Sequence, residues 1–366
     1  MNFLTVKDVK LRNQIVLVRV DYNVPLDEQG NIISDFRIRA SLPTLKFLKE
    51  KGARKIILLS HLGRPDGKKV KELSLKPVAF RLAELLPEEK VEFVDDVSGP
   101  DVEDAVNSLK KGGILLLENL RFYPGEEKNS DDFIREIIDS TGADIYVQDG
   151  FAVIHRAHAS TSAVAKHLPV YAGLLLEKEI SALDNALKSP KKPLTLVLGG
   201  AKVEEKTPLI SAFSKVADKI LVGGKIAADG LPKEILENPA LSEKLYVAED
   251  FDEDSAGNKL DIGPLATAKF ADVIKASKTV IWNGLLGKAE DTAFSTGSEF
   301  IAKTLGETEN INSIILGGDT TGFIENLLED NPDLKYSLLS TGGGAALEFL
   351  SGNSLPGLEV VETAVR

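Results

Sequence analysis

The stretch Leu194-Thr-Leu-Val-Leu-Gly-Gly-Ala-Lys-Val-Glu-Glu-Lys206 combines an apolar run, a glycine pair and two lysines. The first five residues are apolar or β-branched, which is typical of a strand buried in a parallel sheet. Gly199 and Gly200 allow the backbone to turn tightly and to approach a ligand closely. Lys202 and Lys206 are four residues apart, so in a helix their ammonium groups share one face. The stretch predicts a polyphosphate site at a helix N-terminus, although an ordinary strand–helix turn with solvated lysines has the same pattern.

Two common nucleotide-binding motifs are absent from the chain. There is no G-x-x-x-x-G-K-[ST] P-loop and no G-x-G-x-x-G dinucleotide fingerprint. Their absence argues against a P-loop kinase and against a nicotinamide-dependent dehydrogenase. Other parts of the chain must therefore indicate which anions it binds.

Length and composition are those of a globular protein with more than one core. At 366 residues the chain is long enough for two domains, and 43% hydrophobic with 27% charged residues is an ordinary composition. We find no apolar run of membrane-spanning length and no leader pattern, so we expect a cytoplasmic protein without a membrane partner. The absence of cysteine excludes disulfides, thiolate catalysis and cysteine-bound metals.

Charge divides the chain into two unlike halves. The net charge of −12 argues against nucleic-acid binding. Residues 1–170 hold 25 Lys and Arg against 26 Asp and Glu, whereas residues 171–366 hold 19 against 30. Ten of the eleven arginines and all four histidines lie before residue 170. Because arginine binds carboxylate and phosphate through paired hydrogen bonds and lysine acts as a point charge, we expect the halves to bind different anions.

Strand patterns alternate with helical patterns in the first half. The expected strands are 15–20, 55–60, 91–94, 113–118 and 144–148, and the expected helices are 38–51, 75–86, 102–109 and 131–140. This alternation predicts a parallel sheet that binds ligands beyond the carboxyl ends of its strands. Polar residues follow those ends: Asp21, Asn23, His61, Arg64, Asn119, Arg121, Asp149, His155, Arg156 and His158, with Arg37 before the first helix. His155 and His158 lack acidic co-ligands, so contact with an anion or simple packing is favoured over a metal pair.

The second half repeats the α/β pattern but carries glycines at its strand ends. The expected strands are 194–198, 219–222, 244–248, 279–282, 313–316 and 336–339, and residues 160–190 carry two amphipathic helical patterns. Glycines at 342–344 precede a helical pattern at 345–350 and can expose backbone N–H groups to an anion, although a flexible turn is the simpler alternative. Asp319 is the acidic residue best placed to meet a phosphate-bound Mg²⁺.

Longer runs of sequence carry a more specific signal. They are Arg19-Val-Asp-Tyr-Asn-Val-Pro25, Arg37-Ile-Arg-Ala-Ser-Leu-Pro-Thr44, Ser60-His-Leu-Gly-Arg-Pro65, Glu118-Asn-Leu-Arg-Phe122, His155-Arg-Ala-His-Ala-Ser160, 199–206, Trp282-Asn-Gly284, Gly317-Gly-Asp319 and 340–346. These runs recur in order from residue 16 to about residue 357. Together they closely resemble the phosphoglycerate kinase family.

The resemblance implies reversible phosphoryl transfer between 1,3-bisphosphoglycerate and ADP, giving 3-phosphoglycerate and ATP with Mg²⁺, in glycolysis and gluconeogenesis. It places the triose on Asp21, Asn23, Arg37, His61, Leu62, Gly63, Arg64, Arg121, His155 and Arg156. It places the nucleotide on Gly200, Lys202, Lys206, Gly223, Gly224, Leu260, Asn283, Glu290, Gly317, Gly318, Asp319 and Thr320, with the metal on Asp319. The catalytic residues would be Arg37, Lys202, Gly342 and Gly343.

The resemblance also implies the domain organisation. We expect two doubly wound α/β domains, each with a parallel sheet flanked by helices, facing each other across a hinged cleft. Residues 1–170 would bind the triose and residues 171–351 the nucleotide. The C-terminal tail, 352–366, would pack back on the first domain, and the family expectation is a monomer.

Departures from the family pattern concern two regions. Asp149-Gly-Phe-Ala-Val-Ile154 has its glycine moved, in the loop that precedes Arg156. Lys225 and Leu285 stand where the family has glycine and proline, and residues 225–260 are shorter. We therefore expect phosphate chemistry to be kept and discrimination between nucleobases to be weakened.

One alternative is a catalytically silent homologue that acts as a binding protein. It would require the loss of a charged transfer residue. Arg37, Lys202, Lys206 and Asp319 are all present, so the enzyme is favoured.

Overall fold

The computed structural model describes residues 3–363, which divide into two compact units. Unit 1 comprises Met1–Ile180 with Ser354–Arg366, and unit 2 comprises Ser181–Asn353. The chain thus forms most of unit 1, then all of unit 2, and returns to unit 1. Among the described residues, none of the helices is both long enough and apolar enough to cross a bilayer.

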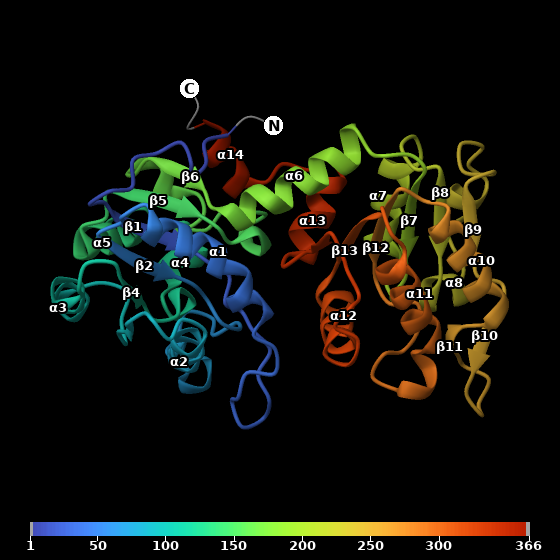
Figure 1. Cartoon of the computed structure of the whole chain (residues 1–366), viewed down its shortest axis with the longest axis horizontal. Coiled ribbons are helices and arrows are strands. Elements are labelled where there is room, and N and C mark those ends of the chain that lie inside the picture. Colours follow the sequence, from blue (N-terminus) through green and yellow to red (C-terminus); the bar gives the residue numbers. More distant parts are fainter. Residues whose placement is uncertain (1–2, 364–366) are drawn as a thin grey trace. The chain divides into compact units, whose positions relative to one another are not determined.

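Unit 1 is built on a six-stranded parallel sheet (Figure 1). Its strands, in order across the sheet, are β3 (Val91–Phe93), β4 (Gly113–Leu116), β2 (Lys55–Leu59), β1 (Ile15–Arg19), β5 (Ile145–Gln148) and β6 (Val170–Ala172). The four central strands are almost wholly buried, which agrees with their runs of Ile, Leu and Val. Because the strands are parallel, their carboxyl ends lie along one edge of the sheet.

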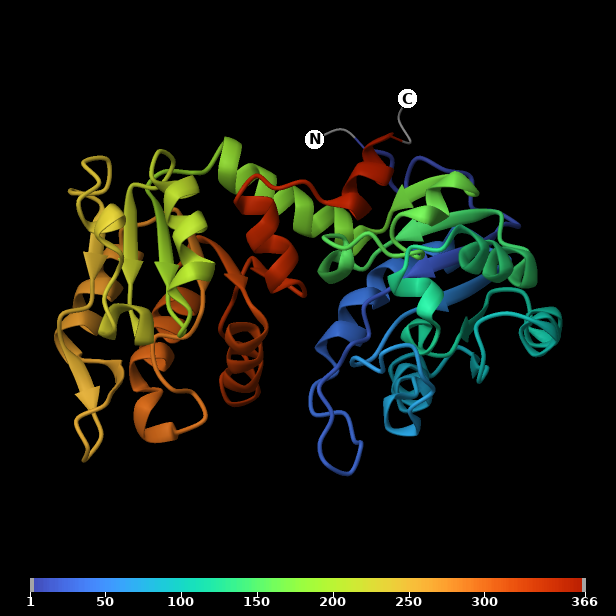
Figure 2. The ribbon, with the colours of Figure 1, turned by 180° about the vertical axis from the view of Figure 1, so that it is seen from behind.

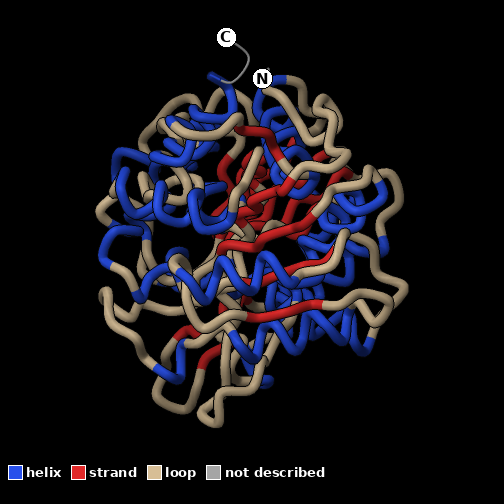
Figure 3. The backbone as a smooth tube through the Cα atoms, turned by 90° about the vertical axis from the view of Figure 1, so that its left-hand side faces the viewer, coloured by secondary structure: helices blue, strands red, loops and turns tan. Residues whose placement is uncertain are grey.

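Helices cover both faces of this sheet (Figure 3). α1 (Phe36–Glu50) packs on α2 (Lys76–Leu85), and α3 (Pro100–Ser108) packs on α5 (Asp131–Thr141). The chain moves toward one edge of the sheet through α1 and α2 and back through α3 and α5, so right-handed crossovers place the two pairs on opposite faces. Local sequence sets the ends of α5: the Ser130 hydroxyl accepts a hydrogen bond from the Phe133 N–H (3.3 Å), and Gly142 ends the helix in the left-handed conformation.

Unit 2 contains a second six-stranded parallel sheet (Figure 2). Its strands, in order, are β14 (Leu338–Leu339), β13 (Asn312–Leu316), β12 (Thr279–Asn283), β7 (Leu194–Leu198), β8 (Lys219–Val222) and β9 (Leu245–Val247). The chain leaves β7 through α7 (Val203–Phe213) toward β8, and leaves β12 through α11 (Thr296–Glu307) toward β13. These directions are opposite, so the carboxyl ends of β7 and β12 form the switch point at which open α/β sheets bind ligands.

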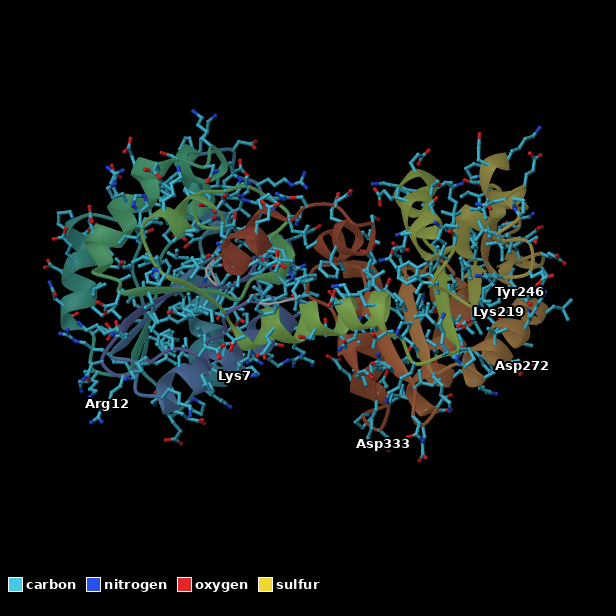
Figure 4. All side chains as sticks on the ribbon, turned by 90° about the horizontal axis from the view of Figure 1, so that it is seen from above. Lys7, Arg12, Lys219, Tyr246, Asp272 and Asp333 are labelled. Atoms are coloured by element: carbon cyan, nitrogen blue, oxygen red, sulfur yellow. The ribbon has the colours of Figure 1, made fainter. Side chains whose placement is uncertain are left out.

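Tyr246, in the edge strand β9 of unit 2, contacts two lysine side chains (Figure 4). The ammonium groups of Lys219 and Lys269 lie 4.8 and 4.7 Å from the centre of the Tyr246 ring. Lys219 also donates a hydrogen bond to the Tyr246 hydroxyl (2.8 Å). Positive charges at a sheet edge discourage pairing with another chain.

The expected fold of two parallel α/β sheets is confirmed, and one local prediction is wrong. Residues 160–190 form only one long helix, α6 (Leu174–Lys188), preceded by a 3₁₀ turn (Ala163–Lys166) and by β6. The short apolar run of β6 is a strand because it pairs with β5, which periodicity cannot reveal. The hairpin of β10 (Phe251–Glu253) and β11 (Lys259–Ile262) was not predicted either, because its strands are short and half exposed.

The C-terminal helix α14 (Pro356–Thr363) packs on β6 of unit 1. Gly357 donates a backbone hydrogen bond to the Ile154 carbonyl oxygen (2.8 Å). A Cβ atom at Gly357 would lie 2.8 Å from the Ile154 Cα atom, so only glycine permits this approach. Residues 364–366 of the predicted tail lie outside the described residues.

A buried carboxyl group, Asp149, holds the start of α6. Its Oδ1 accepts hydrogen bonds from the N–H groups of Leu175 (3.0 Å) and Leu176 (3.4 Å). Its Oδ2 is buried and makes no hydrogen bond with the described residues. Burial raises the pKa of Asp149 to about 7, so in the folded protein this group retains a proton that an exposed aspartate would lose.

We predict that Asp149 gives the stability a distinct pH dependence. The folded chain holds the proton up to about pH 7, whereas the unfolded chain releases it near pH 3.8. The free energy of unfolding from this group therefore falls as the pH rises through that range, and Asp149→Asn removes the fall. Denaturant titrations across the range measure it, with the exposed Asp132→Asn as the control that follows the wild type. Identical pH profiles for Asp149→Asn and the wild type would contradict the prediction.

Candidate functional site

Four adjacent strands of unit 1 place polar side chains along one edge of the sheet. The strands β4, β2, β1 and β5 are neighbours and parallel, so the segments that follow them lie together. These segments contain Asp21 and Asn23, 61–64, 119–121 and 149–158. The topology thus brings together side chains from four separate parts of the chain.

His61 lies between an arginine and an aspartate. Its Nδ1 is 3.0 Å from Arg19 Nη2 and 3.7 Å from Asp21 Oδ1. All three side chains are buried. Burial and the surrounding arginines lower the pKa of His61 well below its ordinary value, so the imidazole is neutral near pH 7.

Two further contacts join the loops after β1 and β2 to α1. Arg37, in the first turn of α1, donates a hydrogen bond from Nη1 to Asp21 Oδ2. The Asn23 side-chain oxygen accepts a hydrogen bond from the Gly63 N–H (2.8 Å). Because the Asn23 N–H also donates to Asp21 Oδ1 (3.2 Å), the predicted residues Asp21, Asn23, Arg37 and Gly63 form one connected group.

Arg121 is held by the loop after β2. Its Nη1 donates to the Gly63 carbonyl oxygen (2.8 Å). The Asn119 side chain donates to the Leu62 carbonyl oxygen (2.7 Å) and accepts from the Arg121 N–H (3.0 Å). Burial and the neighbouring arginines lower the pKa of Arg121 to about 10, so it remains protonated near neutral pH.

The loop after β5 contributes Arg156 and two histidines. Arg156 Nε donates to His155 Nε2 (3.1 Å). Burial and the arginine charges lower the pKa of His158 to about 3. Glu126, fully buried, accepts hydrogen bonds from the Ser160 N–H (3.0 Å) and hydroxyl (2.6 Å), and its Oε1 is 3.8 Å from His158 Nδ1. Glu126 thus places a negative charge behind this loop.

Positive charge is the common property of this edge. We call Arg19, Arg37, Arg121 and Arg156 the arginine cluster, because all four lower the pKa of His61. Like charges this close repel one another, and Asp21, Glu126 and Glu127 provide only part of the compensation. The carboxyl edge of unit 1 therefore suits a ligand with more than one anionic group.

In unit 2 the backbones after β7 and β12 touch at the switch point. Gly199 N–H donates to the Asn283 carbonyl oxygen (3.0 Å), and Gly200 N–H donates to that of Leu285 (2.7 Å). A Cβ atom at Gly199 would lie 2.1 Å from the Leu285 oxygen. The glycine pair is thus required for close approach of the two turns.

Lys206 is buried beside the contact between the turns that follow β7 and β12. It is 7% exposed and donates a hydrogen bond from Nζ to Asn283 Oδ1. Asn283 in turn donates to the Leu316 carbonyl oxygen (3.1 Å). Burial lowers the pKa of Lys206, and the charge of Asp319 acts in the opposite direction, so Asp319 lies within electrostatic reach.

The turns after β13 and β14 meet at the same edge. A Cβ atom at Gly343 would lie 2.6 Å from the Gly317 Cα atom. Two helices start at this contact: α12 (Gly318–Asp330) and α13 (Gly343–Leu350). Thr320 Oγ1 accepts a hydrogen bond from the Gly284 N–H (2.9 Å), and Asp319 is exposed in the first turn of α12. The first N–H groups of a helix have no acceptor within it, so this edge suits an anion.

A second pair of glycines borders the region predicted to hold the nucleoside. Gly223 precedes α8 (Gly224–Ala228), and a Cβ atom at Gly224 would lie 2.9 Å from the Leu285 carbonyl oxygen. The Leu260 carbonyl oxygen in β11 accepts a hydrogen bond from the Lys288 N–H (2.9 Å). The predicted Gly223, Gly224 and Leu260 therefore border the segment that follows β12.

Three predicted site residues lie apart from these contacts. Arg64 and Glu290 are exposed and make no hydrogen bond or ion pair with the described residues. Lys202 is exposed and pairs with Glu205 of α7 (2.9 Å), which raises the pKa of Lys202. Lys202 itself has an extended backbone just before the helix, so the prediction that Lys202 and Lys206 share one helix face is wrong. The roles predicted for Arg64, Glu290 and Lys202 depend on a ligand.

Two residues of this edge, Arg19 and Glu126, are not among those predicted from the sequence. Arg19 stands as the one charged residue in the run Ile-Val-Leu-Val-Arg-Val at positions 15–20. A charged residue inside an apolar strand indicates a buried charge, and buried charges require partners. This signal could have identified Arg19. Glu126 gives no such signal, since it lies in an ordinary polar segment.

We predict that two glycines of unit 2 respond differently to alanine. Gly343→Ala should lower the free energy of unfolding by about 1–3 kcal/mol, because its Cβ meets the Gly317 backbone. Gly318→Ala is the matched control, since no atom lies within 4 Å of its Cβ position. Fluorescence of Trp282, the single tryptophan and fully buried in β12, reports unfolding of unit 2. Equal effects of the two substitutions would contradict the packing at Gly343.

Comparisons with known proteins agree over the whole chain. A family model for phosphoglycerate kinase matches residues 6–232 and 231–353. The chain is 42% identical over 402 aligned residues to the phosphoglycerate kinase of Geotalea daltonii, with 99% of each chain covered. Solved phosphoglycerate kinases from Coxiella burnetii and Pyrococcus horikoshii are also similar. The first has 33% identity, full coverage of both chains and a TM-score of 0.81; the second has 28% identity, 99% coverage of both and a TM-score of 0.87.

The two parallel sheets and these similarities define a kinase of the two-unit α/β class. The chain belongs to the phosphoglycerate kinase family. Its reaction is therefore transfer of phosphate to the carboxyl group of 3-phosphoglycerate, with a nucleotide as the second substrate. The resemblance drawn from the sequence motifs is confirmed.

Proposed function

We propose that unit 1 binds 3-phosphoglycerate or 1,3-bisphosphoglycerate and that unit 2 binds Mg·ATP or Mg·ADP. The arginine cluster at the carboxyl edge of unit 1 is the observation that supports this division most strongly. Guanidinium groups match the planar carboxylate and the oxygens of phosphate. Unit 2 offers lysines, glycine turns and helix N-termini instead, which suit a polyphosphate chain.

Individual residues are assigned to the substrates on this basis. The triose is assigned to Asp21, Asn23, Arg37, His61, Leu62, Gly63, Arg64, Arg121, His155 and Arg156. The nucleotide is assigned to Gly200, Lys202, Lys206, Gly223, Gly224, Leu260, Asn283, Glu290, Gly317, Gly318, Asp319 and Thr320. These assignments keep the expected triose domain (1–170, with the tail 352–366) and nucleotide domain (171–351), whereas the compact units divide at Ile180 and Ser181.

The chemistry requires no general base. The acceptor carboxylate is ionised near neutral pH, so its oxygen can bond to the γ-phosphorus of ATP while the bond from that phosphorus to the ADP oxygen breaks. No proton is transferred. The protein then aligns the reactants and balances charge on the transferred group, and we assign charge balance to Arg37, Lys202 and the N–H groups of Gly342 and Gly343.

The residues of unit 2 fit a magnesium ion that arrives with the nucleotide. Among the described residues, no group of three or more His, Asp or Glu side chains is arranged to hold a metal alone. Enzymes that use Mg²⁺ with nucleotides often supply only one or two carboxylates, and the phosphates supply further ligands. Asp319, exposed beside Lys206, would be such a carboxylate. When bound, the ion neutralises charge on the phosphates.

The remaining expectations concern the location of the enzyme, its oligomeric state and its motion. We propose that it acts in the cytoplasm as a monomer and that a hinge motion accompanies catalysis. Scattering with and without both substrates tests the motion. The silent-homologue alternative has no support, because the charged transfer residues are present.

Activity is tested directly with the purified protein. An assay that couples formation of 1,3-bisphosphoglycerate from 3-phosphoglycerate and Mg·ATP to a dehydrogenase should give steady turnover. A folded protein that gives no turnover would overturn the proposed function. Repeating the assay with GTP tests the weaker discrimination between nucleobases expected from Lys225 and Leu285.

We predict that Arg37→Lys lowers kcat by about 10²-fold or more. A lysine ammonium cannot hold two oxygens in one plane, and loss of a contact made to the transition state appears in kcat. Arg39→Lys is the matched control on the same helix, because Arg39 pairs with Asp35 (3.1 Å) rather than with Asp21. A kcat near the wild-type value in Arg37→Lys would disprove the role.

We predict that Asp319→Asn weakens use of the Mg·nucleotide and spares the triose. The KM for Mg·ATP should rise by about 10- to 100-fold, as is common when a group that supports a metal is removed. The KM for 3-phosphoglycerate should change little, because the triose residues belong to unit 1. Glu329→Gln, exposed on the same helix, is the control. Equal increases in both KM values would argue against the assignment.

A further inference from the structure

We propose that Arg19 is a positioning residue that fixes the tautomer of His61, so that Nε2 of the imidazole presents its proton to the triose substrate. The proposal rests on the proposed role of unit 1 in triose binding. Arg19 lies behind His61, at the end of β1, and is not among the residues assigned to the substrates. It acts on the ligand through the histidine.

The contact between the two side chains determines which nitrogen carries the proton. Arg19 Nη2 lies 3.0 Å from His61 Nδ1. A guanidinium group has five N–H donors and no acceptor. The nitrogen of His61 in this contact must therefore accept, and it can accept only when it carries no proton.

The charge state of His61 leaves one tautomer. Its burial and the arginine cluster favour the neutral ring, as the lowered pKa shows. A neutral imidazole carries one proton, and which nitrogen holds it is set by the partner of the other. With Nδ1 occupied by Arg19, the proton is on Nε2.

The opposite tautomer has no acceptor for its proton. The nearest carboxylate oxygen, Asp21 Oδ1, is 3.7 Å from Nδ1, which is too long for a hydrogen bond. The same Asp21 carboxylate already accepts from Arg37 and from the Asn23 N–H. A proton on Nδ1 would face the Arg19 N–H groups instead, and two donors repel.

His61 Nε2 is free to meet a ligand. Nε2 makes no hydrogen bond with the described residues. Because it is also not one of the fully buried polar atoms without a partner, it is accessible to a ligand. An N–H held at this position can donate to an anionic oxygen. The other tautomer would direct a lone pair at the anion and repel it.

The setting of Arg19 supports a dedicated role. Its side chain is fully buried, and its one hydrogen bond with the described residues is to His61; Nε and Nη1 have none. The charge of Glu126 favours the ionised guanidinium against its burial. Burying a charged guanidinium that makes only one hydrogen bond, to His61, lowers the stability of the fold. A structural role alone therefore does not account for Arg19.

The first test measures the tautomer in the absence of substrate. Nitrogen-15 NMR of His61 should show Nε2 protonated and Nδ1 unprotonated in the wild type. Arg19→Met, which removes the donor, should give a mixture of tautomers, while Arg19→Lys should restore the wild-type pattern in part. A proton on Nδ1 in the wild type, or an unchanged pattern in Arg19→Met, would overturn the proposal. The wild-type spectrum and Arg19→Lys carry the test if Arg19→Met does not fold.

The second test separates positioning from loss of charge. Arg19→Met should raise the KM for 3-phosphoglycerate by about 10- to 100-fold, as for the loss of a hydrogen bond to a charged group. In a His61→Gln background the glutamine amide has no tautomers, so the added effect of Arg19→Met should be much smaller. Equal effects in both backgrounds would mean that Arg19 acts only through its charge, and would overturn the proposal. Arg12→Met, at an exposed arginine of unit 1 (Figure 4), is the control.

These tests distinguish failure of the inference from failure of the proposed function. The NMR pattern is measured without substrate and does not depend on turnover. A fixed Nε2 proton in a protein without kinase activity would refute the proposed function alone. A mixture of His61 tautomers in a wild-type protein with kinase activity would refute only the role of Arg19.

Discussion

Electrostatic repulsion among the four arginines of the arginine cluster is the constraint on which unit 1 depends. Their charges all act on one imidazole, and burial adds a further cost by weakening hydration. The fold withstands this because Asp21 contacts Arg37 and because Glu126 lies buried near Arg19. The compensation is incomplete, so a ligand with several negative charges stabilises the native edge as it binds. The repulsion that the fold must withstand is thus also what attracts such a ligand.

The corresponding edge of unit 2 depends on close approach of backbones rather than on clustered charge. The turns after β7 and β12 touch through Gly199 and Gly200, and those after β13 and β14 touch through Gly317 and Gly343. Side chains at these contacts would force the turns apart. Of the two lysines that follow β7, Lys206 is buried and fixed by Asn283, whereas Lys202 is exposed. What this edge offers to an anion is therefore mainly backbone N–H groups.

The sequence was sufficient for the α/β class, for the main strands and for the family, because long apolar runs and ordered motifs are local signals. It did not predict β6, because the identity of β6 as a strand depends on pairing with β5. It did not predict the hairpin of β10 and β11 either. In the site, it could suggest Asp21, His61 and Arg121 from their positions after strands. It could not supply the contact of Arg19 with His61 or the burial of Glu126, because both depend on side chains that come together only in the folded sheet.

The return of α14 to unit 1 has a consequence for synthesis of the protein. Gly357 packs against Ile154, directly before the loop with His155 and Arg156, so unit 1 includes a segment that is synthesised only after all of unit 2. At 5–20 residues per second, translation of unit 2 takes roughly 10–35 s. Throughout that interval the nascent first unit lacks its final helix. During this delay the loop with His155 and Arg156 lacks the helix that packs beside it, although that loop is translated about two hundred residues earlier.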